Sequence, residues 1–125
     1  MPPSFSVSVF SLENLTRVCL AGYNRYAMKY NIHTTAHFDK WLGKLRDRQT
    51  KRKIAGRLAR VEMGNFGDFK SISTNLFELR FFFGGGLRIY YTIRENQVVL
   101  LLVGGDKSSQ QRDIEKAKRI LDGQE

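Results

Sequence analysis

The chain has 125 residues, which suits one domain with a single core, and its 42% hydrophobic and 26% charged residues argue against a disordered chain. Its one cysteine excludes an intramolecular disulfide and a thiolate zinc cluster, and no apolar run is long enough to span a bilayer. The net charge is +9, with nine lysines and arginines against three acids between Asp39 and Glu62. This balance predicts a polyanionic partner, nucleic acid or an acidic protein, although a merely solvated basic face would give the same count.

Residues 1–27 differ from the rest of the chain, because they carry only three charges and no sustained hydrophobic period. We predict either a weakly structured N-terminal extension or a start site assigned too early, with Met28 as the real start. A short extra helix is the alternative for this segment. A single domain is expected over residues 28–125. The segment lacks the positive start of a secretory signal, and we expect a cytoplasmic protein.

The first part of this domain predicts one strand followed by two helices. Residues 30–34 alternate between apolar and polar positions, as in a short strand. Apolar residues at spacings of three and four predict a helix over residues 38–45, with Thr35 as its N-cap. A second helix follows over residues 51–61, and Gly64 suits the position just after its end.

The second part is rich in strands. Residues 76–83 and 87–93 alternate strictly, and the glycines 84–86 between them predict a hairpin with positive φ angles. The segment VVLLLVG, residues 98–104, is apolar on both faces, which predicts a central strand.

A last helix is expected to begin near Ser108, with Gln111 at capping-box spacing, and to bury Ile114, Ala117 and Leu121. The element order is then β-α-α-β-β-β-α. This order predicts an α+β fold, a small antiparallel sheet with helices packed on one face.

Four side chains are expected on the opposite, open face of the sheet: Glu78, Arg80, Arg88 and Tyr90. Two arginines and a phenol could hold a phosphodiester and an unstacked base, whereas a cross-strand Glu–Arg pair is the alternative. Lys107 follows the central strand just before a helix N-terminus, where backbone donors and the helix dipole favour an anion. We therefore predict a phosphate site here, against the alternative of a solvated lysine.

Neither a metal nor a cofactor is predicted. His33 and His37 lie four residues apart, but no cysteine or carboxylate cluster accompanies them. The glycines 84–86 lack the following Lys-Ser/Thr of a P-loop.

Three segments, FDKWLGKLRDRQTKRKIAGRLARVEMGNFGDFKSI, ELRFFFGGGLRIYY and LLLVGGDKSSQQRDIEKAKRI, together resemble the RelE/ParE toxin superfamily. The closest resemblance is to its branch of addiction module killer proteins, related to the HigB toxins. It extends from Met28 to about Leu121. The resemblance implies the toxin of a type II toxin–antitoxin pair, neutralised by a small helix-turn-helix DNA-binding antitoxin.

The resemblance also implies two possible activities. Ribosome-dependent members of the superfamily are metal-independent endoribonucleases (mRNA interferases), which cut mRNA by attack of a ribose 2′-OH on the adjacent phosphate. ParE-type members share the fold but inhibit DNA gyrase and cut nothing. Inhibition of translation through mRNA cleavage is the activity we favour, with gyrase inhibition as the alternative and a non-catalytic RNA-binding module as a third interpretation.

Carried over by position, Arg88 matches a phosphate-contacting arginine of the RNA-cutting members. Lys107 matches their basic residue after the last strand, and Arg80 a basic position one strand earlier. Glu78 is the candidate general base, as the only carboxylate expected on the open face. The lysines that the best-known members carry before Arg80 are replaced by Leu76 and Glu78, and no aromatic residue stands early in the last helix.

The second predicted helix is expected to contact the phosphate backbone of ribosomal RNA, in a salt-sensitive way. The antitoxin is expected to bind over this helix or over the open face. Beside Tyr90, the candidate RNA-binding residues are Lys51, Arg52, Lys53, Arg57 and Arg60.

Overall fold

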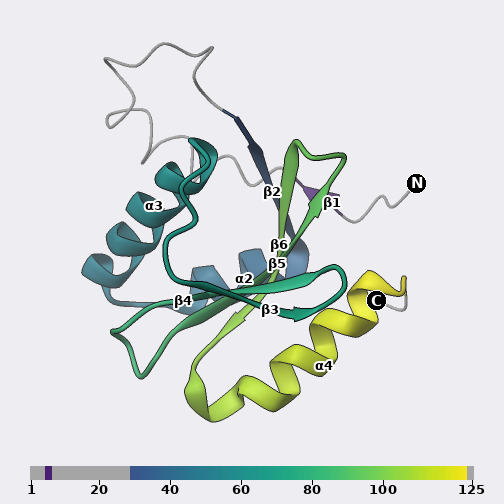
Figure 1. Ribbon diagram of the computed structural model, residues 1–125. Coiled ribbons are helices and arrows are strands. Elements are labelled where there is room, and N and C mark those ends of the chain that lie inside the picture. The colour runs from purple at the N-terminus through teal and green to yellow at the C-terminus, as the bar shows by residue number, and fades with distance from the viewer. Residues whose placement is uncertain (1–4, 7–28, 124–125) are drawn as a thin grey trace.

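The computed structural model describes residues 5–6 and 29–123, which form one sheet with helices on both of its faces (Figure 1). In chain order the elements are β1 (Phe5–Ser6), β2 (Asn31–Thr35), α2 (Ala36–Lys44), α3 (Arg48–Glu62), β3 (Phe69–Ser73), β4 (Leu76–Arg80), β5 (Arg88–Arg94), β6 (Val98–Gly105), the 3₁₀ helix η2 (Lys107–Ser109) and α4 (Gln110–Leu121). The predicted α+β class is confirmed.

The sheet is mixed, with the strand order β1-β2-β6-β5-β4-β3. β6 is an inner strand, as its apolar character predicted, but it pairs with β2 in the parallel direction. All the other pairs are antiparallel. The prediction of a purely antiparallel sheet was therefore wrong, because side-chain alternation is the same in strands of either direction.

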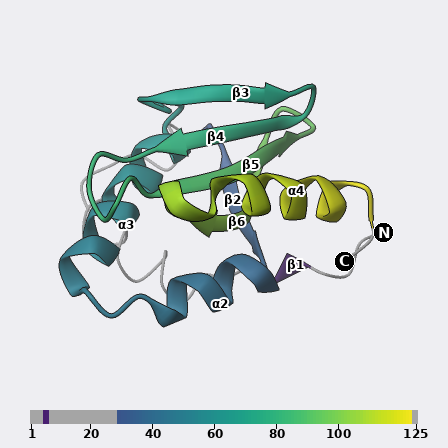
Figure 2. The same cartoon turned by 90° about the horizontal axis from the view of Figure 1, so that it is seen from below.

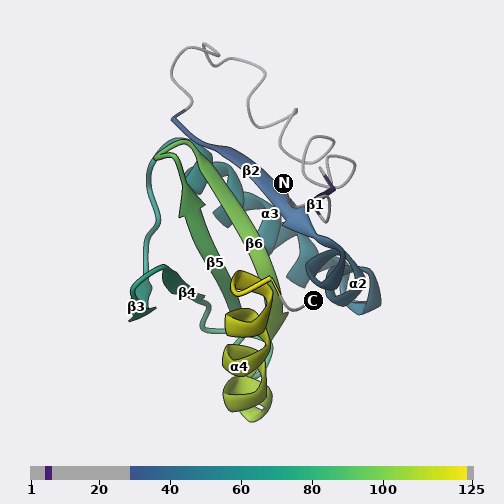
Figure 3. The same cartoon turned by 90° about the vertical axis from the view of Figure 1, so that its right-hand side faces the viewer.

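Helices cover both faces of the sheet, not one as the sequence had suggested. α2 and α3 pack on the face that carries Leu79, Ile89 and Leu101, whereas α4 packs on the face that carries Tyr90 and Leu102. Figure 3 shows α4 in front of the sheet, α3 behind it and α2 beside its right-hand edge. Two covered faces explain why β6 is apolar at positions of both parities.

The predicted ends of the first two helices are confirmed. Thr35 caps α2, since its Oγ1 accepts a hydrogen bond from the Phe38 N–H, and it donates to the Leu102 carbonyl at 2.6 Å. This second bond ties the start of α2 to β6. At the end of α3, Gly64 has a φ of +93°, the left-handed conformation that glycine adopts without strain.

One strand was not foreseen, whereas the expected hairpin is present. The segment after α3 forms the edge strand β3, which pairs with β4 through a bulge between Ser71 and Ser73. β3 is mostly exposed, so it lacks the buried alternation by which strands are recognised. The expected hairpin between β4 and β5 is present, and Gly84, Gly85 and Gly86 all have positive φ angles.

Of the N-terminal segment, only the two residues of β1 lie within the described part of the chain, and they pair with residues 34–35 of β2. The rest of residues 1–27, on which the predictions of an extension, a later start or an extra helix depend, lies outside it. None of the described helices is both long and apolar enough to cross a membrane.

Gly104 marks a close approach between β6 and α2. A Cβ atom built on it would overlap the ring of Trp41, whereas one on Gly56 in α3 would meet nothing within 4 Å. We expect Gly104→Ala to lower the free energy of unfolding by about 1–3 kcal/mol, because the packed ring has to move. Gly56→Ala should raise it by roughly 0.5–1 kcal/mol, since alanine favours the helix. Urea unfolding of both variants would test this, and equal midpoints would contradict it.

Candidate nucleic-acid interface

The β4–β5 hairpin lies beside the start of α4 and brings two predicted site residues together (Figures 1 and 2). The Lys107 N–H donates to the Gly85 carbonyl at 3.3 Å. A Cβ atom on Gly86 would lie 3.3 Å from Arg88 Nη1 and 3.5 Å from Lys107 Cβ. Both cationic residues therefore converge on Gly86, whose lack of a side chain leaves room between them.

Arg88 is held in place from two sides. Its Nη1 donates to the Gly86 carbonyl at 2.9 Å, and its Nε lies 3.3 Å from Glu78 Oε2 in an ion pair. The Arg88 side chain is 16% exposed, so it reaches the surface only in part. An arginine fixed in this way is pre-organised to receive an anion at its remaining N–H groups.

Glu78 does not lie on an open face, contrary to prediction. Its side chain is 1% exposed, beneath α4, and Gln110 Nε2 donates to Oε2 at 3.0 Å. Glu78 is buried because α4 packs on the face of the sheet that was predicted to be uncovered. In this geometry the carboxylate touches Arg88 and Gln110 but is closed off from solvent, so it orients Arg88.

Tyr90 was expected to offer its ring to a base, and this expectation is also wrong. The residue is completely buried, directly opposite Glu78 in the sheet and within the apolar cluster under α4. Burial first, and then the Glu78 carboxylate, raise the pKa of the phenol far above its ordinary value, so Tyr90 stays neutral. It is a core residue.

The helix start beside Lys107 is already occupied by a carboxylate of the chain itself. Asp106 Oδ1 accepts from the Ser108 N–H at 2.9 Å, and Asp106 and Ser109 form a capping box. Ser108 was expected to cap this helix, but Asp106 does so. The Ser108 hydroxyl is the main group that lowers the pKa of Asp106. The backbone N–H groups that were predicted to attract a phosphate are therefore already hydrogen-bonded. The exposed side chain of Lys107 remains available to bind one.

Arg80 pairs directly with Arg88 across the two strands. Its Nη2 forms an ion pair with Asp68 Oδ1 at 2.9 Å, which raises the pKa of the guanidinium, and its side chain remains 41% exposed. Asp68 was not identified from the sequence, because no local pattern relates the loop after α3 to β4. Arg80 therefore reaches the surface as half of an ion pair.

The predicted basic helix is α3, and one of its cations has a structural role. Arg57 donates to three backbone carbonyls, those of Phe66, Asp68 and Arg80, and lies over the ring of Phe81. Burial lowers the pKa of Arg57. Its contact with RNA stays a prediction, beside this structural role. The other four remain at least partly exposed: Lys51, Arg52, Lys53 and Arg60.

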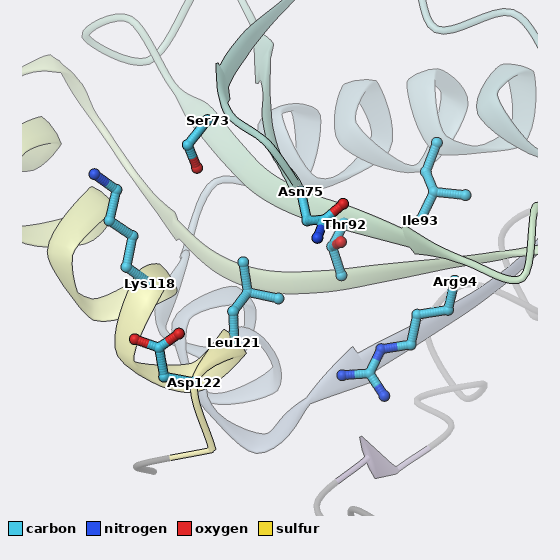
Figure 4. Close-up of a pocket in the computed structure, with 8 residues that line it drawn as sticks. All are labelled: Ser73, Asn75, Thr92, Ile93, Arg94, Lys118, Leu121 and Asp122. Atoms are coloured by element: carbon cyan, nitrogen blue, oxygen red, sulfur yellow. The ribbon is translucent and has the colours of Figure 1, made fainter.

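A separate hollow of about 520 Å³ lies near the C-terminal end of α4 (Figure 4). Thr92 and Arg94 of β5 line it together with Lys118 and Asp122. Arg88 begins β5 and Arg94 ends it, so the hollow lies at the other end of the strand from the Arg88–Lys107 pair. Its charged groups have both signs, and it is not part of the same site.

No metal site is evident in the part of the chain that the structure describes. Nowhere among those residues do three histidine, cysteine, aspartate or glutamate side chains lie close enough to hold an ion. The groups that make up the candidate site are cationic side chains and their hydrogen-bond partners.

Residues 40–122 match the family model described as Phage derived protein Gp49-like (DUF891). An uncharacterized protein of Haemophilus influenzae is 47% identical over 93 residues, which cover 74% of this chain and 94% of the relative. No solved structure matches the chain.

Proposed function

Because this chain belongs to the Gp49-like family of phage-derived proteins, a toxin-like family related to addiction module toxins, we propose that it is the toxin of a type II toxin–antitoxin module. Within that class we assign it to the HigB-like branch of the RelE/ParE superfamily. The proposed activity is inhibition of translation by ribosome-dependent cleavage of mRNA in the cytoplasm.

The observation that carries this proposal is the convergence of Arg88 and Lys107 on Gly86 at the edge of the hairpin. Two cationic residues beside a residue without a side chain would together suit a phosphate group. The exposed cations of α3 extend the basic surface, which suits the backbone of ribosomal RNA.

The proposed reaction is attack of a ribose 2′-OH on the adjacent phosphate. The new O–P bond forms as the bond to the 5′ oxygen of the next nucleotide breaks, which gives a 2′,3′-cyclic phosphate and a 5′-OH. Arg88 and Lys107 would stabilise the charge that develops on the phosphate oxygens, and Arg80 would contact a neighbouring phosphate. The ribosome would hold the message in position, so that the toxin has to supply few catalytic groups.

Glu78 has a positioning role in this proposal. It contacts Arg88 and Gln110 beneath α4, with 1% of its side chain exposed. The proton of the 2′-OH would accordingly leave to a group of the ribosome or to water.

The partners follow from the same proposal. They are the ribosome with its mRNA, and a small helix-turn-helix antitoxin that binds over α3 or over the hairpin edge. An acidic segment of the antitoxin would be steered to the exposed cations of α3, so its association should be fast at low salt.

One experiment distinguishes this activity from its main alternative. The chain is induced in a bacterial host, and the 5′ ends of all messages are mapped alongside a measurement of DNA breaks. We expect new 5′ ends within translated regions, with intact DNA. DNA breaks with intact messages would contradict the proposal.

Those breaks would support ParE-like inhibition of DNA gyrase without chemistry. A specific observation keeps this second candidate in view, since Glu78 and Tyr90 are both buried and the hairpin edge therefore offers cations without a general base. An RNA-binding module without catalysis would give neither cuts nor breaks.

A further inference from the structure

Phe82 is the most exposed large hydrophobic residue of the described chain, with 89% of its surface accessible. Its neighbours Phe81 and Phe83 pack into the core on the α3 side, and Lys53 lies 4.8 Å from the centre of the Phe83 ring. Phe82 itself lies in the connection that follows β4, next to Phe83, whose carbonyl accepts hydrogen bonds from the Gly86 and Leu87 N–H groups.

The surroundings of Phe82 are cationic. The hairpin that carries it also positions Arg88 and Lys107, through Gly85 and Gly86. No acid occurs between Glu78 and Glu95, and Glu78 is buried in its ion pair with Arg88. Phe82 therefore lies in the same short connection as Gly85 and Gly86, the two residues that bond to Lys107 and Arg88.

We propose that Phe82 is a stacking platform for an unpaired RNA base whose adjacent phosphate is held by Arg88 and Lys107. The inference takes its ligand, RNA, from the proposed function. It adds a stacking contact with a base, which Tyr90 cannot make because it is buried. Every base has a flat π face, so one exposed ring in a basic groove binds single strands with little regard to sequence.

A protein partner explains the same ring less well. Protein interfaces are built on contiguous apolar surface, and only one other large hydrophobic residue is exposed in the described chain, Phe69 at 51%. Phe69 lies on the edge strand β3, and its ring is 6.1 Å from that of Phe66 in a tilted arrangement. Proteins that bind single-stranded nucleic acid present this arrangement, an exposed aromatic ring among cationic residues.

The test measures binding of the full chain to a fluorescein-labelled RNA of ten adenosines, and to the same ribose-phosphate strand without bases. We expect Phe82→Leu to weaken binding to the adenosine strand about tenfold, which is within the range for one lost stacking contact. Binding to the abasic strand and the slope of affinity against salt should not change, because the phosphate contacts remain.

Two variants serve as controls. Phe82→Trp should keep the affinity, because it keeps an aromatic face, and Phe69→Leu should leave it unchanged. The inference is overturned if Phe82→Leu binds both strands as the unaltered chain does, or if that chain binds neither. It is also overturned if sedimentation shows that the chain self-associates through Phe82.

The outcome separates this inference from the proposed function. Loss of stacking in Phe82→Leu, in a chain that cuts no message in cells, would support the platform and contradict the mRNA cleavage. In-frame cuts that persist in Phe82→Leu, together with unchanged binding, would support the cleavage and contradict the platform.

Discussion

Induction of the Arg88→Ala, Lys107→Ala double variant is expected to leave bacterial growth unimpaired. Each residue would supply a charge contact that strengthens as the phosphate becomes more negative in the transition state. Loss of one such contact removes about 2–4 kcal/mol of stabilisation, or roughly thirtyfold to a thousandfold in rate. The measurements are growth after induction and the yield of new 5′ ends in the mapped messages.

Lys107 gives the cleaner single variant. It is exposed and holds the hairpin only through its backbone N–H, so Lys107→Ala should fold normally. Arg88→Ala would leave the buried carboxylate of Glu78 without its cation, which is destabilising in itself. A combined Glu78→Gln, Arg88→Gln variant removes both charges and keeps two polar side chains in contact.

The matched control is Lys118→Ala, which removes an equally exposed lysine at the other end of α4. It should stay as toxic as the unaltered chain. Full toxicity of the Arg88→Ala, Lys107→Ala double variant, confirmed as folded, would exclude the phosphate site.

The sequence predicted those features of the fold that are local. The caps at Thr35 and Gly64 and the glycine hairpin depend on residues close together in the chain, and all three are present. The direction of β2 against β6 depends on residues far apart in the chain, and the face on which α4 packs depends on the whole sheet. The amphipathic pattern of α4 specifies a buried side but not which side of a sheet it meets.

The errors in the candidate site have this same origin. Glu78, Arg80, Arg88 and Tyr90 do share one face, as the alternation predicted. Exposure on that face was assumed, but α4 buries Glu78 and Tyr90 and leaves the arginines at the margin. Gln110 could not have been foreseen, because its contact with Glu78 depends on how α4 is placed across the strands.

Arg57 also illustrates what a charge pattern cannot distinguish. Its position in a basic helix resembles that of Arg60, one turn later, but the two side chains differ in what they touch. Arg60 is exposed, whereas Arg57 reaches the carbonyls of three residues that belong to the loop after α3 and to the end of β4. Arg57 thereby fixes the loop that holds Asp68 against Arg80.

We expect Arg57→Ala to lower the free energy of unfolding by about 2–4 kcal/mol, because three part-buried carbonyls lose a charged donor and Phe81 loses the group over its ring. Arg57→Lys should recover only a small part of this, since an ammonium group lacks the planar fork that spans several acceptors. Arg60→Ala, the matched control, should stay within about 0.5 kcal/mol of the unaltered chain. The measurement is urea unfolding, with the midpoints compared at constant slope. Equal midpoints for Arg57→Ala and Arg60→Ala would show that Arg57 has no such structural role. Arg57 would then count among the cations of α3 that are proposed to contact RNA.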